Sequence, residues 1–206
     1  MKKEITEIGI VLDKSGSMGS IRNDTIGGVN TFIEDQIKAD GDANMTLVSF
    51  NQSVYIIQES VDINTIDLLT KENYVPNGMT ALYDAIGVTI GILKANIDKR
   101  EDADKPEKVI VVVITDGFEN SSKDHTAKDI RTTIKEMENK YDWEFIYLGA
   151  NQDAFEVGGA MGFRGGSTRD WDVTADGADL MYSSLSKSVS GYRKTGEVKF
   201  EDDDKE

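Results

Sequence analysis

Residues 8–19 read IGIVLDKSGSMG, and this stretch decides the fold of the chain. It opens with a short run of aliphatic and β-branched residues, which is typical of a strand buried in a sheet. The run ends at Asp13, and a loop with two serines and two glycines follows. A carboxylate and hydroxyls directly after a buried strand indicate a polar site at the carboxyl edge of a sheet. Ligands bind at that edge in open α/β folds.

The rest of the chain alternates short apolar runs with longer segments of helical period. Strands are predicted at 8–12, 44–50, 54–58, 108–115 and 144–149, with a short last strand later, and helices at about 21–39, 63–69, 82–97, 130–137, 154–161 and 180–192. The short link 51–53 predicts a hairpin, and therefore one antiparallel edge strand. The unbroken apolar run within 108–115 predicts a strand covered on both faces. We expect an α/β fold with a mostly parallel six-stranded sheet and helices on both faces.

Composition excludes several classes of function. The 206 residues include 23 basic and 38 acidic side chains, for a net charge of −15. This charge argues against binding to nucleic acid or to an anionic membrane surface. There is no cysteine and only one histidine, His125, which excludes disulfides, thiolate zinc sites and any site that needs two imidazoles. Residues 1–7 do not resemble a signal peptide, and we expect a cytoplasmic protein.

Oxygen-bearing side chains occur at three points that are predicted to lie at one edge of the sheet. Asp13, Ser15 and Ser17 alternate along an extended segment, so they can point the same way. Thr80 precedes a long helix, and Asp116 follows the strand 108–115. Mg²⁺ prefers oxygen ligands and is commonly bound by one or two carboxylates together with water. The sequence therefore predicts a divalent-cation site for Mg²⁺, with Mn²⁺ or Ca²⁺ able to substitute.

These residues resemble the metal-ion-dependent adhesion site (MIDAS) of von Willebrand factor type A (VWA) domains. The segments DKSGSM, GMTALYDAI and VVITDG fill the motif in order, and IYLGANQDAF and SSLSKSVSGYR are similar to stand-alone bacterial or phage VWA proteins. The resemblance implies the three-layer, Rossmann-like VWA fold and a protein-binding module rather than an enzyme. It implies that the metal is held, directly or through water, by Asp13, Ser15, Ser17, Thr80 and Asp116. An Asp or Glu of a partner protein then completes the coordination.

Two other functions remain open at this point. A carboxylate at the end of the first strand, with Mg²⁺, also describes phosphoryl-transfer enzymes in which Asp13 would be the nucleophile. Those enzymes usually carry a second aspartate two residues later, where this chain has Ser15. The third possibility is a metal that only stabilises the fold and has no open coordination position.

The resemblance covers about residues 4–193, and we expect a VWA domain at residues 1–195 followed by an acidic tail at 196–206. The tail carries the ligand type that the site accepts, so self-occupancy of the metal is a further hypothesis. Asp84, one helical turn after Thr80, is expected to be a solvated or capping acid, with a role behind the metal as the alternative. His125 is expected to be exposed near the start of a helix.

Overall fold

Six strands form one sheet in the computed structural model, which describes residues 5–151 and 153–200. The strands are β1 (Ile5–Asp13), β2 (Asp42–Phe50), β3 (Val54–Asp62), β4 (Lys108–Thr115), β5 (Glu144–Gly149) and β6 (Thr168–Asp170). Their order across the sheet is β3-β2-β1-β4-β5-β6, and every neighbouring pair is parallel except the hairpin of β2 and β3. The predicted sheet with one antiparallel edge strand is confirmed.

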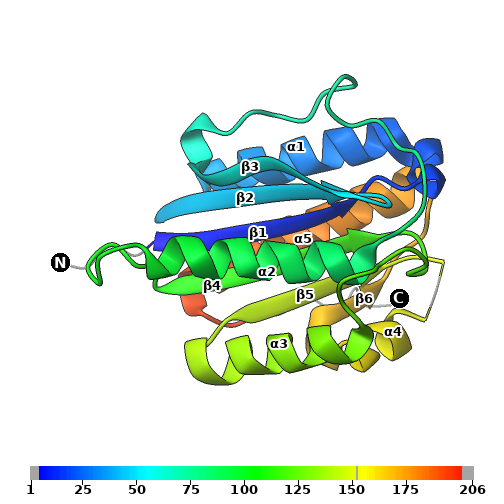
Figure 1. Ribbon diagram of the computed structural model, residues 1–206. Coiled ribbons are helices and arrows are strands. Elements are labelled where there is room, and N and C mark those ends of the chain that lie inside the picture. The colour runs from blue at the N-terminus through cyan, green and yellow to red at the C-terminus, as the bar shows by residue number, and fades with distance from the viewer. Residues whose placement is uncertain (1–4, 152, 201–206) are drawn as a thin grey trace.

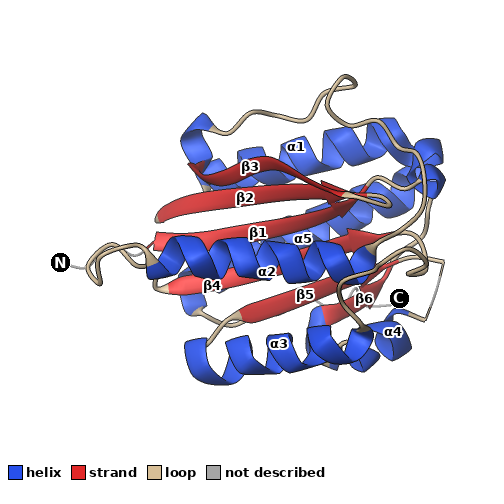
Figure 2. Cartoon of the chain, in the orientation of Figure 1, coloured by secondary structure: helices blue, strands red, loops and turns tan. Residues whose placement is uncertain are grey.

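Helices cover both faces of this sheet (Figures 1 and 2). They are α1 (Arg22–Lys38), α2 (Leu82–Asp98), α3 (Ala127–Tyr141), α4 (Ala154–Ala160) and α5 (Ala175–Thr195), with 3₁₀ turns at Gly16–Ile21, Ile63–Thr65 and Gly165–Ser167. Helices α1 and α5 pack on one face, and α2 and α3 pack on the other. The three-layer α/β architecture is therefore also confirmed. None of the helices among the described residues has the length and apolar character needed to cross a membrane.

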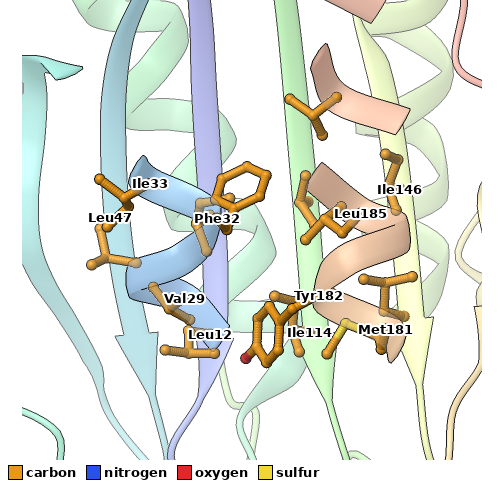
Figure 3. Close-up of a cluster of buried hydrophobic side chains, with 14 of the residues drawn as sticks. Leu12, Val29, Phe32, Ile33, Leu47, Ile114, Ile146, Met181, Tyr182 and Leu185 are labelled. Atoms are coloured by element: carbon orange, nitrogen blue, oxygen red, sulfur yellow. The ribbon is translucent and has the colours of Figure 1, made fainter. Parts of the chain in front are cut away.

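Alternate side chains of β4 enter two separate cores, because successive residues of a strand face opposite sides of the sheet. Ile110, Val112 and Ile114 belong to the core beneath α1 and α5, part of which Figure 3 shows. Val111 and Val113 belong to the core beneath α2. Each such side chain contributes about 1.5–3 kcal/mol when it is fully buried. Burial on both faces explains why the sequence of this strand is apolar without interruption.

The helix predicted at 63–69 is wrong. One 3₁₀ turn, Ile63–Thr65, is followed by extended chain that returns to the carboxyl edge of the sheet. Asn30 of α1 holds this chain: its amide nitrogen donates to the carbonyl of Leu69 at 3.0 Å, and its amide oxygen accepts from the N–H of Leu69 at 2.8 Å. The apolar spacing that suggested a helix arises because Ile63 and Leu69 are buried separately in the core beneath α1.

Strand β1 begins earlier than the apolar run predicts, and the added residues include polar ones. Thr6 and Glu7 are buried, although neither is hydrophobic. The carboxylate of Glu7 accepts hydrogen bonds from the guanidinium of Arg100 at 2.7 Å and from the hydroxyl of Ser60 at 2.8 Å. An ion pair with a distant residue thus extends the strand, and periodicity cannot detect it.

The chain continues along the core beyond the predicted boundary of the VWA domain. After α5 ends, Val198 and Phe200 pack against the core beneath α1 and α5. The guanidinium carbon of Arg169 lies 4.5 Å from the centre of the Phe200 ring. The hypothesis that the acidic tail occupies the metal site concerns mainly residues 201–206, which lie outside the described part of the chain.

Helices α1 and α5 approach each other closely at Gly28. A Cβ placed on Gly28 would lie 2.0 Å from the ring of Tyr182, which belongs to α5. A Cβ placed on the neighbouring Gly27 would meet no atom within 4 Å. The two adjacent glycines therefore differ in what they allow, and only Gly28 makes room for the opposing helix.

We expect Gly28→Ala to destabilise the protein by about 1–3 kcal/mol, because the new methyl group overpacks the interface with Tyr182. The matched control Gly27→Ala should be neutral or should stabilise the protein by up to about 1 kcal/mol, since alanine is the better helix former. Urea unfolding of both variants, followed by circular dichroism, measures the difference. Equal midpoints for the two variants would contradict the close approach of the helices.

Candidate metal centre

The two central strands bring the two predicted carboxylate ligands to the same edge of the sheet. Leu12 of β1 lies opposite Ile114 of β4 in the parallel register. Asp13 is the last residue of β1, and Asp116 follows the last residue of β4, Thr115. The hydroxyl of Thr115 donates to Oδ2 of Asp13 at 2.7 Å. The strand ends are therefore tied together at the point where both carboxylates are located.

Asp13 is fully buried, and both of its carboxylate oxygens accept hydrogen bonds. Oδ1 accepts from the backbone N–H of Ser15 at 2.6 Å, and Oδ2 accepts from Thr115. The hydroxyl of Tyr74 donates to the backbone carbonyl of Asp13 at 2.6 Å. Burial raises the pKa of Asp13 to about 6, although the hydrogen bonds from Thr115 and Ser15 oppose this shift. The carboxylate is thus held in one orientation, at an electrostatic cost in the absence of a cation.

The serine hydroxyls connect the first loop to the second carboxylate. The hydroxyl oxygens of Ser15 and Ser17 lie 3.1 Å apart, and the Ser17 hydroxyl donates to Oδ1 of Asp116 at 2.6 Å. The other oxygen of Asp116, Oδ2, is buried and has no hydrogen-bond partner among the described residues. Burial also raises the pKa of Asp116, against the effect of the Ser17 hydrogen bond. A buried carboxylate oxygen without a partner is costly, and an ion or a water bound at this point would satisfy it.

Thr80 faces the same point from a third loop. A Cβ placed on Gly117 would lie 3.6 Å from the hydroxyl oxygen of Thr80 and 3.6 Å from that of Ser17. Both hydroxyls therefore border the small space beside Gly117, next to Asp116. The structure brings all five predicted residues to one edge of the sheet, and their role as metal ligands remains a prediction.

The sequence analysis missed Asn120, which fixes the position of Thr80. The backbone N–H of Thr80 donates to Oδ1 of Asn120 at 2.9 Å, and the N–H of Asn120 donates to the carbonyl of Thr80 at 3.0 Å. On the other side, the N–H of Met79 donates to Oε1 of Gln52 at 3.1 Å. The reciprocal pair ties the loop of Thr80 to the loop that follows Asp116. The only sequence signal for Asn120 is its place in that loop.

Asp84 differs from the solvated or capping acid that we expected. Its carboxylate accepts the backbone N–H groups of Lys123, Asp124 and His125 at 2.8–3.0 Å. Burial opposes the ionised form, but these hydrogen bonds outweigh it, and the pKa of Asp84 is lowered. Asp84 therefore holds the loop after Asp116 against α2 and is neither a solvated acid nor a helix cap.

His125 is also less exposed than expected. Its side chain is 33% exposed, and its ring covers Gly87 of α2, where an added Cβ would lie 2.6 Å from Nε2. Nδ1 of His125 lies 3.3 Å from Oδ1 of Asp84. Gly87 and Asp84 of α2 thus form the surface on which His125 packs, and the sequence alone did not predict this contact.

The set of donors fits a hard divalent cation. Every candidate ligand is an oxygen, and two of the groups are carboxylates. No group of three or more His, Cys, Asp or Glu side chains suited to a metal occurs within the described residues. A cation at this edge would therefore depend on hydroxyls and water as well as on Asp13 and Asp116. The unpartnered Oδ2 of Asp116 is the atom that such a cation would satisfy.

The fold is that of VWA domains. A von Willebrand factor type A protein from Catenulispora acidiphila matches 92% of this chain with a TM-score of 0.60 at 13% identity, and the match covers 43% of that protein. Proximal thread matrix protein 1 of the mussel byssus, in a structure with a zinc-occupied MIDAS motif, matches 91% of this chain with a TM-score of 0.61 at 15% identity, over 46% of its own length. The open conformation of the pilus adhesin SpaC from Lactobacillus rhamnosus GG matches 92% of this chain with a TM-score of 0.63 at 12% identity, over 30% of its length.

This chain spans less than half the length of each of these structures. No protein-family model matches the sequence, and no curated protein does so either. At such low identity the structural likeness establishes the fold alone.

The raised pKa of Asp13 predicts how the metal-free protein responds to pH. The pKa is about 6 in the folded chain, against an ordinary value of 3.8. The folded chain therefore keeps a proton that the unfolded chain releases, and the stability from this group is lost as pH rises through that window. We expect the loss to be on the order of 3 kcal/mol.

Urea unfolding in chelator at a series of pH values, for the wild type and for Asp13→Asn, isolates this group. The asparagine does not titrate, so the stability difference between wild type and variant should fall between pH 4 and about 6.5. A difference that stays constant with pH would contradict the raised pKa of Asp13.

Proposed function

We propose that this domain is a metal-dependent protein-binding module whose cation captures an acidic side chain of a partner. In this proposal Asp13, Ser15, Ser17, Thr80 and Asp116 hold the ion, directly or through water, and Mg²⁺ is the ion in cells. The observation that carries the proposal is the buried, unpartnered oxygen of Asp116 at the place where the three loops converge. The VWA fold and the zinc-occupied MIDAS motif of the mussel protein support it.

Charge explains why a partner's carboxylate would bind here. Two carboxylates leave a divalent ion close to neutral, and the hydroxyls add no charge. Ser17 is exposed, whereas Asp13 and Ser15 are buried, so a cation at this point would have protein on one side and solvent on the other. A carboxylate from outside can then replace a bound water and form a charge-assisted contact, even though the chain as a whole is acidic.

The geometry favours binding over phosphoryl transfer. Asp13 has no exposed surface, so a phosphate ester has no direct access to its carboxylate. The second aspartate that such enzymes usually carry two residues later is replaced by Ser15. The exposure of Ser17 favours an open coordination position over a purely structural metal.

Metal binding by the wild type should raise its thermal unfolding temperature in Mg²⁺, because a ligand that binds only the folded state stabilises it. Asp116→Asn keeps the shape of the side chain but removes one of two ligand charges, and we expect Mg²⁺ affinity to fall by about tenfold or more. Asp124→Asn, a change at an exposed aspartate in a nearby loop, removes the same charge and should bind Mg²⁺ as the wild type does.

Isothermal titration with Mg²⁺ and scanning calorimetry measure both effects. Equal Mg²⁺ affinity in the wild type and in Asp116→Asn would rule out the proposed site.

Partner capture is tested with a fluorescein-labelled peptide that carries one aspartate in a glycine–serine background. Binding should occur in Mg²⁺, should disappear in chelator, and should be absent for the peptide with asparagine in place of aspartate. The protein should not hydrolyse p-nitrophenyl phosphate in Mg²⁺. Turnover that Asp13→Asn abolishes would support the enzyme instead, and strong metal stabilisation without peptide binding would support the structural metal.

A further inference from the structure

Two bulky apolar side chains stand exposed in the loops that form the candidate metal centre. Met79 directly precedes Thr80 and is 53% exposed, and Phe118 follows Asp116 by two residues and is 59% exposed. The candidate ligands beside them converge next to Gly117. We call Met79 and Phe118 the apolar rim. A single exposed apolar side chain needs no explanation, but two of them in the loops of one polar site offer apolar surface to a partner that binds there.

The backbone holds the rim in this exposed position. The N–H of Met79 donates a hydrogen bond to Gln52. The N–H of Thr80 donates to the side chain of Asn120, and the carbonyl of Thr80 accepts from the N–H of Asn120. Gly78 has a φ of +77°, and a Cβ there would lie 1.7 Å from Oε1 of Gln52, so this turn requires glycine. The loops that carry the rim are therefore fixed before any partner arrives, which lowers the entropic cost of binding.

A positive charge lies beside the same loops. Lys14 stands between Asp13 and Ser15, and its Nζ lies 3.4 Å from the centre of the Tyr55 ring. The N–H of Asn77 donates to the carbonyl of Lys14 at 2.9 Å, which joins this segment to the loop of Thr80. In a chain with a net charge of −15, Lys14 supplies one positive charge that an acidic partner would meet beside the site.

We propose that the partner presents its acidic residue in an extended segment with a bulky apolar residue two positions away, and that this apolar side chain packs on Met79 and Phe118. Residues i and i+2 of an extended chain point to the same side, so one segment can direct a carboxylate and an apolar group at the same surface. The carboxylate reaches the cation while the apolar group covers the rim. This inference rests on the proposed function and adds the class of partner sequence.

The test uses three fluorescein-labelled nine-residue peptides in a glycine–serine background. The first has one central aspartate, the second adds phenylalanine two positions before and after it, and the third is the second with asparagine for aspartate. Fluorescence anisotropy in Mg²⁺ and in chelator gives the affinities for the wild type and for Phe118→Ser. The control variant is Phe155→Ser, because Phe155 is 50% exposed but lies on α4.

We expect the wild type in Mg²⁺ to bind the second peptide about tenfold more tightly than the first, as partial burial of an aromatic ring would give. Phe118→Ser should lose most of that preference while its affinity for Mg²⁺ and for the first peptide stays unchanged. Phe155→Ser should behave as the wild type. The ratio of the two affinities is insensitive to competition by the chain's own acidic tail, since the tail would compete equally with both peptides.

Each other outcome overturns either the role of the apolar rim alone or the proposed function as well. Metal-dependent binding of both peptides with equal affinity overturns the role of the rim and leaves the proposed function intact. Equal binding of the second and third peptides, or binding that survives chelation, overturns both. Binding of neither aspartate peptide at millimolar concentration also overturns both. If the wild type dimerises at assay concentration and Phe118→Ser does not, a second copy of the chain covers the rim and the inference is wrong.

Discussion

The hydrogen bond between the Thr115 hydroxyl and the Asp13 carboxylate joins the ends of the two central strands, and the site depends on it. It forms because β1 and β4 are parallel neighbours in a register that places Leu12 opposite Ile114. A slip by one residue would turn every side chain of a strand to the other face. The two cores that fix this register therefore also fix the distance between the candidate ligands. Packing far from the polar edge decides the chemistry at the edge.

Metal-free, this arrangement stores electrostatic strain in the site. Two carboxyl groups with raised pKa values, Asp13 and Asp116, lie in a buried cluster with one oxygen unpartnered. The fold can afford this because the apolar strands on either side are buried on both faces. A cation would convert the same groups from a liability into ligands. Such a conflict between local preference and stability is common at binding sites.

The sequence predicted the architecture well where a strand is buried on both faces and is therefore apolar along its whole length. The strands of the central sheet are apolar runs because helices cover both faces, so 108–115 and 144–149 were located to the residue. It failed where a distant polar partner decides the conformation. Asn30 holds the segment near Leu69 in an extended conformation, although the spacing of its apolar residues predicts a helix. Arg100 pairs with Glu7 and so allows this acid to be buried in a strand.

The candidate site was predicted from three short motifs because alternation and strand ends are local properties. The structure brings these residues together at one edge of the sheet. The residues that hold the surrounding loops in place could not be predicted from the sequence. Asn120 and Gln52 act through single amide groups whose partners depend on how two loops fold against each other. The packing of His125 on Gly87 likewise depends on which helix lies beside the loop, and the sequence does not show this. Side chains that bond to loop backbone leave no periodic trace in a sequence.

The extended crossover from β3 to α2 should tolerate substitutions less freely than an ordinary surface loop. Its path depends largely on side chains: Asn30 bonds to Leu69, Asn73 accepts from the N–H of Thr70, and Arg22 donates to the carbonyl of Tyr74. Tyr74 in turn reaches Asp13. Surface loops generally accept substitution freely, because little depends on any one of their residues. The shape of this loop instead depends on a few polar side chains, and two of them, Arg22 and Asn30, belong to α1. Substitutions outside the loop should therefore disturb its path as much as substitutions within it.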